Sequence, residues 1–201
     1  MQTSHIQWSE NVIVADADYI DRVAFNLSVN FERMLGRRMP KADFATWAVD
    51  ISLDGGLRPG HHETQVVLVH DTATRRLDNF VPSTFDSELN GQAFRDDRMG
   101  EYIVSSFPVE SITSKDQFIA DIVETVSQQK DVRRIMIIAD SEQGDALSLI
   151  RPLFDRPDAD DKHVTVFAMQ PLQGGRFRQE MLGYSIMNAL GIKADELKGT
   201  N

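Results

Sequence analysis

The chain has 201 residues, with 21 Lys and Arg against 31 Asp and Glu, so its formal net charge is −10. It contains no cysteine, which excludes disulfide scaffolds, thiol enzymes and zinc sites built on cysteine. No stretch approaches the ~18 consecutive apolar residues of a membrane-spanning helix, and the first residues do not resemble a secretory signal. We therefore expect a cytoplasmic protein without membrane contact. The acidic balance also argues against tight nucleic-acid binding, which needs a basic surface.

The chain is expected to open with a buried strand and a long helix. Residues Asn11 to Ala15 form a short apolar, β-branched run, which is typical of a strand buried on both faces. From Ile20 to Leu35, apolar residues recur at steps of three and four, which predicts an amphipathic helix. Asp18, with Asp21 three residues later, can cap its start, and Gly36 can end it.

A β-hairpin is expected in the middle of the chain. Phe44 to Leu53 alternates enough to predict a strand, and Thr64 to Asp71 is a second strand candidate. Between them, Asp54 to Glu63 is rich in Gly and Pro and reads as a loop, so we expect the two strands to pair. The polar stretch 72–99 follows, and we interpret roughly 54–100 as an insertion within one domain.

The second half alternates regularly between strands and helices. A capping box at Ser114 and Gln117 marks the start of one helix. Alternation of this kind implies a mostly parallel sheet with helices on both faces. We therefore predict a single α/β domain over 1–201, a three-layer sandwich with a mostly parallel central sheet and a β-hairpin insertion. The expected strands are 101–107, 134–139 and 163–169, and the expected helices are 118–126, 144–154 and 181–189.

Two predicted strands end in carboxylates, and these are the candidate site. Asp16 and Asp18 follow the first strand, while Asp140, Glu142 and Asp145 follow the strand at 134–139. Ligands of open α/β sheets bind at the carboxyl ends of parallel strands, so both groups are expected at one edge. Converging carboxylates suit Mg²⁺ or Mn²⁺, which can clamp phosphate oxygens or activate water. The alternative is that each acid caps the helix that follows it.

A resemblance to PIN-like NYN domains rests on the stretch DVRRIMIIADSEQGDALSLIRPL (residues 131–153) and the following HVTVFAM. In that family a strand ends in a Gly-Asp-x-Asp type turn, a helix follows, and another strand closes the unit. Asp140 and Glu142 match the two acids of the turn, and Asp16 resembles the acid of the family's first strand end. The resemblance covers about half of the chain, as order of elements more than as identity.

The resemblance implies metal-dependent cleavage of RNA, or of another phosphoester, by a carboxylate cluster. The family's helix with a further acid resembles the one beginning near Asp116, so Asp116 or Asp121 could be an additional contributor. The catalytic residues implied are Asp16, Asp140 and Glu142. The ligands expected for Mg²⁺ or Mn²⁺ are Asp16, Asp18, Asp140, Glu142, Asp145 and Asp121.

The sequence also departs from the family pattern, and other functions remain open. Tyr19 to Asp21 stand where the family usually has an Asn, Ala139 replaces the turn Gly, and Gln143 replaces the usual aromatic. One alternative is a non-catalytic protein-interaction domain, forming a homodimer through the hairpin around Trp47 to His70. Another is a small-nucleotide site, with the backbone of LQGGRF (172–177) holding a phosphate.

Overall fold

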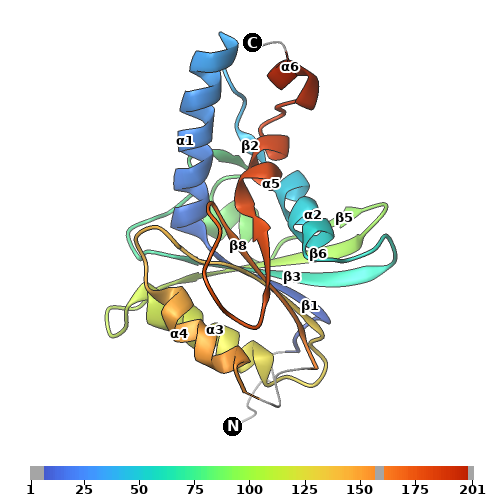
Figure 1. The fold of residues 1–201 in the computed structure, drawn as a ribbon, viewed down its shortest axis with the longest axis vertical. Helices are drawn as coiled ribbons and strands as arrows, with labels where there is room; N and C mark the ends of the chain where they lie inside the picture. Colours follow the sequence, from blue (N-terminus) through green and yellow to red (C-terminus); the bar gives the residue numbers. More distant parts are fainter. Residues whose placement is uncertain (1–6, 157–160, 199–201) are drawn as a thin grey trace.

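A seven-stranded sheet forms the middle of the molecule in the computed structural model, which describes residues 7–156 and 161–198 (Figure 1). The strand order is β5-β6-β3-β1-β7-β8-β9, and every neighbouring pair is parallel except β5 and β6. The strands are β1 (Asn11–Asp16), β3 (His62–His70), β5 (Ala93–Asp96), β6 (Gly100–Pro108), β7 (Arg134–Ile138), β8 (His163–Ala168) and β9 (Arg178–Met181).

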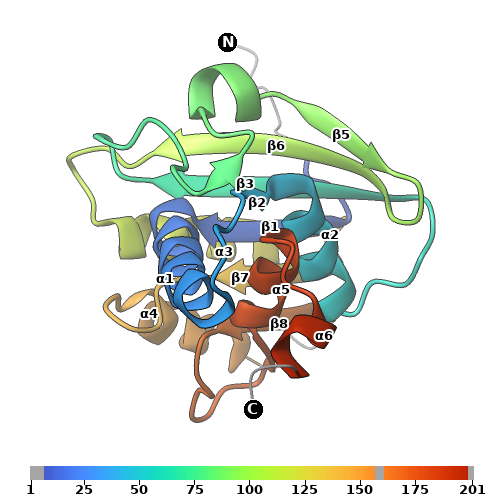
Figure 2. The same ribbon diagram turned by 90° about the horizontal axis from the view of Figure 1, so that it is seen from above.

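Helices cover both faces of this sheet. One face carries α1 (Ala17–Leu35), α2 (Phe44–Asp54) and α5 (Leu182–Ala189), and the other carries α3 (Lys115–Ser127) and α4 (Ala146–Phe154) (Figures 1 and 2). Two apolar cores result, one on each face. The three-layer α/β sandwich with a mostly parallel sheet, as the sequence predicts, is therefore confirmed.

The central strand β1 contributes to both cores. Ile13 and Ala15 pack toward α1 and α2, whereas Val12 and Val14 pack toward α3 and α4. This alternation follows from the two-residue period of a strand, and the apolar, β-branched sequence suits a strand buried on both faces. β3 and β7 pair with β1 on either side. The end of β1 therefore lies at the centre of the molecule.

The strand predicted over 44–53 is wrong, because this segment is the helix α2. Asp43 caps it by accepting a hydrogen bond from the backbone of Thr46 at 2.7 Å. Phe44, Trp47 and Ile51 are buried at the three- and four-residue steps of a helix. Burial against the sheet outweighs the modest helix propensity of the β-branched residues that suggested a strand.

The hairpin expected between 44–53 and 64–71 is therefore also absent. β3 instead pairs in parallel with β1 and β6, deep inside the sheet, and the antiparallel hairpin is formed by β5 and β6. The surface suggested for homodimer pairing is consequently not exposed at β3, and a homodimer itself stays a prediction. The expected insertion over 54–100 includes β3, which belongs to the parallel sheet, so the insertion is reduced to the connection between β3 and β6.

Several short elements complete the chain. The connection from β3 to β6 contains β4 (Phe80–Val81), which pairs with β2 (Ala42–Asp43), and a π-helical turn at Phe85–Leu89. The polar edge strand β9, directly before α5, was not predicted, because its four residues lack apolar alternation. A last helix, α6, spans Ala194–Lys198. Within the described ranges, none of the helices has the length and apolarity needed to cross a membrane.

We predict that Asp43→Ala destabilises the domain by about 1 kcal/mol, because it removes the side chain that caps α2. Urea unfolding followed by circular dichroism measures the change. Asp43→Ser is the matched control, since serine also caps helices and should keep most of the stability. Equal losses in the two variants would contradict a capping role.

Candidate functional site at the carboxyl edge of the sheet

The carboxyl ends of β1, β3 and β7 meet at one edge of the sheet. Ala15 lies opposite Leu68 of β3 and Ile138 of β7 in register. The residues that follow each strand are therefore neighbours in space, as expected for parallel strands. They include Asp16 at the end of β1 and Asp140 after β7, both of which are buried.

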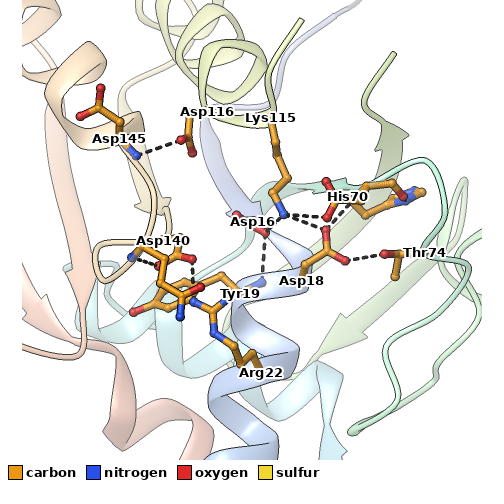
Figure 3. A network of polar contacts seen from close by, with 12 residues as sticks. Asp16, Asp18, Tyr19, Arg22, His70, Thr74, Lys115, Asp116, Asp140 and Asp145 are labelled. Carbon is orange, nitrogen blue, oxygen red and sulfur yellow. Dashed lines mark hydrogen bonds and ion pairs between the residues drawn. The ribbon is translucent and has the colours of Figure 1, made fainter. Parts of the chain in front are cut away.

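Lys115, the first residue of α3, is surrounded by carboxylates at this edge (Figure 3). Its Nζ lies 2.9 Å from an oxygen of Asp18, 3.2 Å from one of Asp16 and 3.3 Å from one of Asp71. The other oxygen of Asp18 accepts a hydrogen bond from the Thr74 hydroxyl at 2.7 Å. Thus α1, α3 and the segment after β3 are joined around one ammonium group.

Asp16 combines a capping role with this ion pair. Its Oδ1 accepts the backbone N–H of Tyr19 at 3.0 Å, which caps α1, and the same oxygen faces Lys115. The sequence assigned this cap to Asp18, whose carboxylate is instead used by Lys115, Thr74 and the backbone of Asp71. The capping alternative therefore holds for Asp16, which also contacts Lys115, while the expected Mg²⁺ or Mn²⁺ site stays a prediction.

Burial and pairing shift the pKa values in opposite directions. Burial raises the pKa of Asp16 to about 6, although Lys115 and the backbone of Tyr19 act against it. Burial also acts to raise the pKa of Asp18, but hydrogen bonds from Thr74 and Lys115 hold that pKa below its usual value. Burial would lower the pKa of Lys115, and the charges of Asp16 and Asp18 raise it overall.

A second ion pair forms beside the first. Nη2 of Arg22, on α1, lies 2.6 Å from Oδ2 of Asp140. Oδ1 of Asp140 accepts the backbone N–H groups of Glu142 and Gln143 at 3.0 and 2.9 Å. Burial acts to raise the pKa of Asp140, but Arg22 and these backbone donors hold it below its usual value. The Arg22 guanidinium also lies 5.2 Å from the ring centre of Tyr19.

The remaining predicted residues do not join a common point. Asp116 accepts the backbone N–H of Asp145 at 2.9 Å, which ties α3 to the start of α4. The side chain of Glu142 is exposed. Asp121 is also exposed, one helical turn and more along α3, where it accepts a hydrogen bond from Gln117.

The donor set as arranged fits an ammonium and a guanidinium better than a divalent metal. Among residues 7–156 and 161–198, no group of three or more His, Asp or Glu side chains is placed to hold a metal ion. Oxygens of Asp16, Asp18 and Asp140 already accept N–H or O–H donors, and Mg²⁺ would need short, near-octahedral contacts to them. The metal-ligand roles assigned to these carboxylates thus remain predictions.

Sequence reasoning missed the cations of the site, Lys115 and Arg22, as well as Asp71. One signal could have revealed Lys115. A cation in the first turn of a helix opposes the helix dipole, and Lys115 directly follows the cap Ser114. A lysine at such a position needs negative charge nearby to offset its unfavourable interaction with the helix dipole, and Asp16 and Asp18 at the strand end supply that charge.

A comparison with known families matches residues 5–197 to a family of unknown function (DUF6621). The chain belongs to this family. No curated protein and no solved structure matches the chain. The chemistry of this DUF6621 member must therefore be argued from its own residues.

We predict that Asp16→Asn flattens the pH dependence of stability. The pKa of Asp16 is raised on folding, so its contribution is full below the unfolded value of 3.8 and is lost as the pH rises through about 6. Asparagine removes this titration but still caps a helix. Between about pH 4.5 and about pH 7, the wild type should lose on the order of 2 kcal/mol more unfolding free energy than the variant. Denaturant unfolding at the two pH values measures this, and parallel losses in both proteins would contradict it.

We predict that Lys115→Met destabilises the domain by about 3 kcal/mol at neutral pH, because a largely buried carboxylate group then lacks its cation. Lys193→Met, at an exposed position, is the matched control and should change stability by less than about 0.5 kcal/mol. Chemical unfolding compares the two variants. A small effect at Lys115 would show that solvent, and not this lysine, compensates the carboxylates.

Proposed function

We propose that the chain is a PIN/NYN-like domain with degenerate activity, a non-catalytic binding domain whose acidic edge holds a lysine where a metal enzyme would hold its ion. The observation that supports this most directly is the convergence of three carboxylates on Nζ of Lys115, at 2.9, 3.2 and 3.3 Å. Asp16, one of the acids on which the resemblance rests, is the last residue of the central strand β1.

The internal cations weaken the case for metal chemistry at this edge. A divalent ion at Asp16 and Asp18 would have to displace an ammonium that the fold already positions at no cost in translational freedom. Asp140 is likewise held by Arg22 and two backbone N–H groups. Two of the three acids expected to act in hydrolysis, Asp16 and Asp140, are therefore used for structure, whereas Glu142 is exposed.

The ion pairs at this edge then stabilise the packing of the elements that meet there. Lys115 connects α3 to α1 through Asp16 and Asp18, and to the segment after β3 through Asp71. These elements are distant in sequence and lie on different faces of the sheet (Figures 1 and 3). A domain stabilised by these ion pairs presents a rigid surface to a partner protein, which fits the protein-interaction role.

A Mg²⁺- or Mn²⁺-dependent ribonuclease or phosphoesterase is the second candidate, supported by two observations. Carboxylates outnumber cations at the edge, since Lys115 alone faces three of them, so negative charge is left for a cation to offset. A depression with a volume of about 490 Å³, within the range of ligand sites, also lies beside the turn that holds Asp140. Ser141, Gly144 and Arg151 are among its lining residues.

We predict that the protein does not cleave single-stranded RNA in the presence of Mn²⁺ or Mg²⁺ at a rate above that of its Asp140→Asn variant. The reason is that Arg22 and Lys115 occupy the carboxylates. Cleavage of a labelled oligonucleotide, resolved on a gel, measures this. Metal-dependent cleavage that Asp140→Asn abolishes would establish the second candidate instead.

Metal binding itself provides an independent readout. The melting temperature of the wild type should not respond to Mn²⁺, whereas Lys115→Met, which leaves the carboxylates without their ammonium, should be stabilised by it. Lys193→Met serves again as the control. Saturable stabilisation of the wild type by Mn²⁺, lost in Asp16→Asn, would contradict the non-catalytic proposal.

A further inference from the structure

A basic pocket lies at the amino edge of the sheet, opposite the acidic site. It has a volume of about 420 Å³, within the range of small-molecule sites. Arg134 and His163 are the first residues of β7 and β8, and Arg178 is the first residue of β9. The lining residues are Gly55, Arg134, Lys162, His163, Val164, Thr165, Gly175, Arg176, Phe177 and Arg178.

The charge of this pocket contrasts with that of the whole chain. Among the described residues that line it are Arg134, Lys162, Arg176 and Arg178 but no carboxylate, in a chain with a net charge of −10. The Nζ of Lys162 is directed to the carbonyls of Gln129 and Val132, so the three arginines supply the available donors. Such a concentration of one sign favours an anionic ligand.

Strand register brings two of these arginines to the same face. Arg134 lies opposite His163, and Arg178 lies opposite Thr165, so all four side chains point to the side of the sheet that α2 covers. Directly after α2, Gly56 has a φ of +91°. A Cβ at Gly56 would come within 3.0 Å of Nη1 of Arg134 and 3.3 Å of Nη1 of Arg178, so the two guanidinium groups converge beside this glycine.

Arg134 and Arg178 repel each other electrostatically, and the hydrogen bonds that they make leave some of their N–H groups unused. Burial and the charge of Arg178 lower the pKa of Arg134, while Glu10 acts weakly against this. Nη1 of Arg134 donates to the carbonyl of Gly55 at 2.6 Å, and no carboxylate in the described part of the chain pairs with it. Arg178 is paired with Glu180 through Nε and Nη2, which leaves its Nη1 toward Gly56.

The nearby acids offset only part of this charge. Glu180 pairs with Arg178, and Asp54 at the end of α2 is influenced by the same arginine without lining the pocket, while Arg134 has no carboxylate partner among the described residues. Two half-exposed guanidinium groups with free N–H donors on converging sides match the several oxygens of a phosphate group. A monocarboxylate offers fewer acceptors and less charge.

We propose that the pocket at the start of β7, β8 and β9 binds the phosphate group of a small phosphorylated molecule, with Arg134 and Arg178 as its ligands. Phe177 also lines the pocket and packs against the core on the α3 side, so it adds apolar surface to the rim. The site lies at the other end of the strands from Lys115, so it does not depend on whether the acidic edge is catalytic.

Titration with inorganic phosphate, pyrophosphate and adenosine monophosphate, followed by thermal shift and calorimetry, tests this proposal. Sodium acetate and sodium chloride at equal ionic strength are the reference anions. The phosphate compounds should raise the melting temperature saturably, and Arg134→Gln or Arg178→Gln should weaken binding at least about tenfold. Arg178, whose side chain is 57% exposed, is the variant that tests binding with little risk to folding.

Arg76→Gln is the matched control, because Arg76 is an exposed arginine paired with Asp78 in the connection between β3 and β6. It should bind phosphate as the wild type does. Three results would overturn the proposal: no saturable response to any phosphate compound, an equal response to chloride, or unchanged affinity in both pocket variants.

Discussion

Asp16 ends the central strand, begins α1 and is almost completely removed from solvent, so the charge on its carboxylate has to be met from within the protein. Lys115 meets it, and the same ammonium also serves Asp18 and Asp71. A buried carboxylate without such a partner would be strongly destabilising. The arrangement of α3 against the strand ends therefore depends on this contact, together with the apolar packing of Ile119 and Val123.

Arg22 extends the same compensation along α1. It lies about one and a half turns from the start of the helix and reaches Asp140 after β7, so the helix that Asp16 caps also carries the cation for Asp140. Helix N-termini add partial positive charge at this edge, because α1, α3 and α4 all begin there. The edge thus combines acidic strand ends with full and partial positive charges of the protein itself. Most of the carboxylate oxygens at this edge that have a partner are thus met by groups of the protein itself.

The sequence predicted those parts of the fold in which local pattern and final burial agree. The run at 11–15 and the stripe from Ile20 to Leu35 correspond to β1 and α1, and Gly36 ends α1 with a φ of +65° as expected. The segment 44–53 was misassigned because its alternation suggested a strand, although Asp43 and the spacing of Phe44, Trp47 and Ile51 indicate a helix. Strand β9 was missed because its four residues show no apolar alternation.

The candidate site was predictable in place but not in content. Parallel strands necessarily bring Asp16 and Asp140 to one edge, and this follows from the sequence pattern alone. Which cation they face depends on where α3 begins relative to β1, and residues far apart in sequence decide that. Lys115 is 99 residues from Asp16 along the chain, so no local sequence pattern predicts that the two side chains meet.

The opposite charge of the two sheet edges has a consequence for how the molecule meets other molecules. Carboxylates gather where the parallel strands end, and arginines gather where β7 and β9 begin. The two edges of the sheet therefore differ in the sign of the groups they present locally. An anionic ligand is attracted more strongly to the side where β7 and β9 begin than to the side where the strands end, in spite of the overall negative charge.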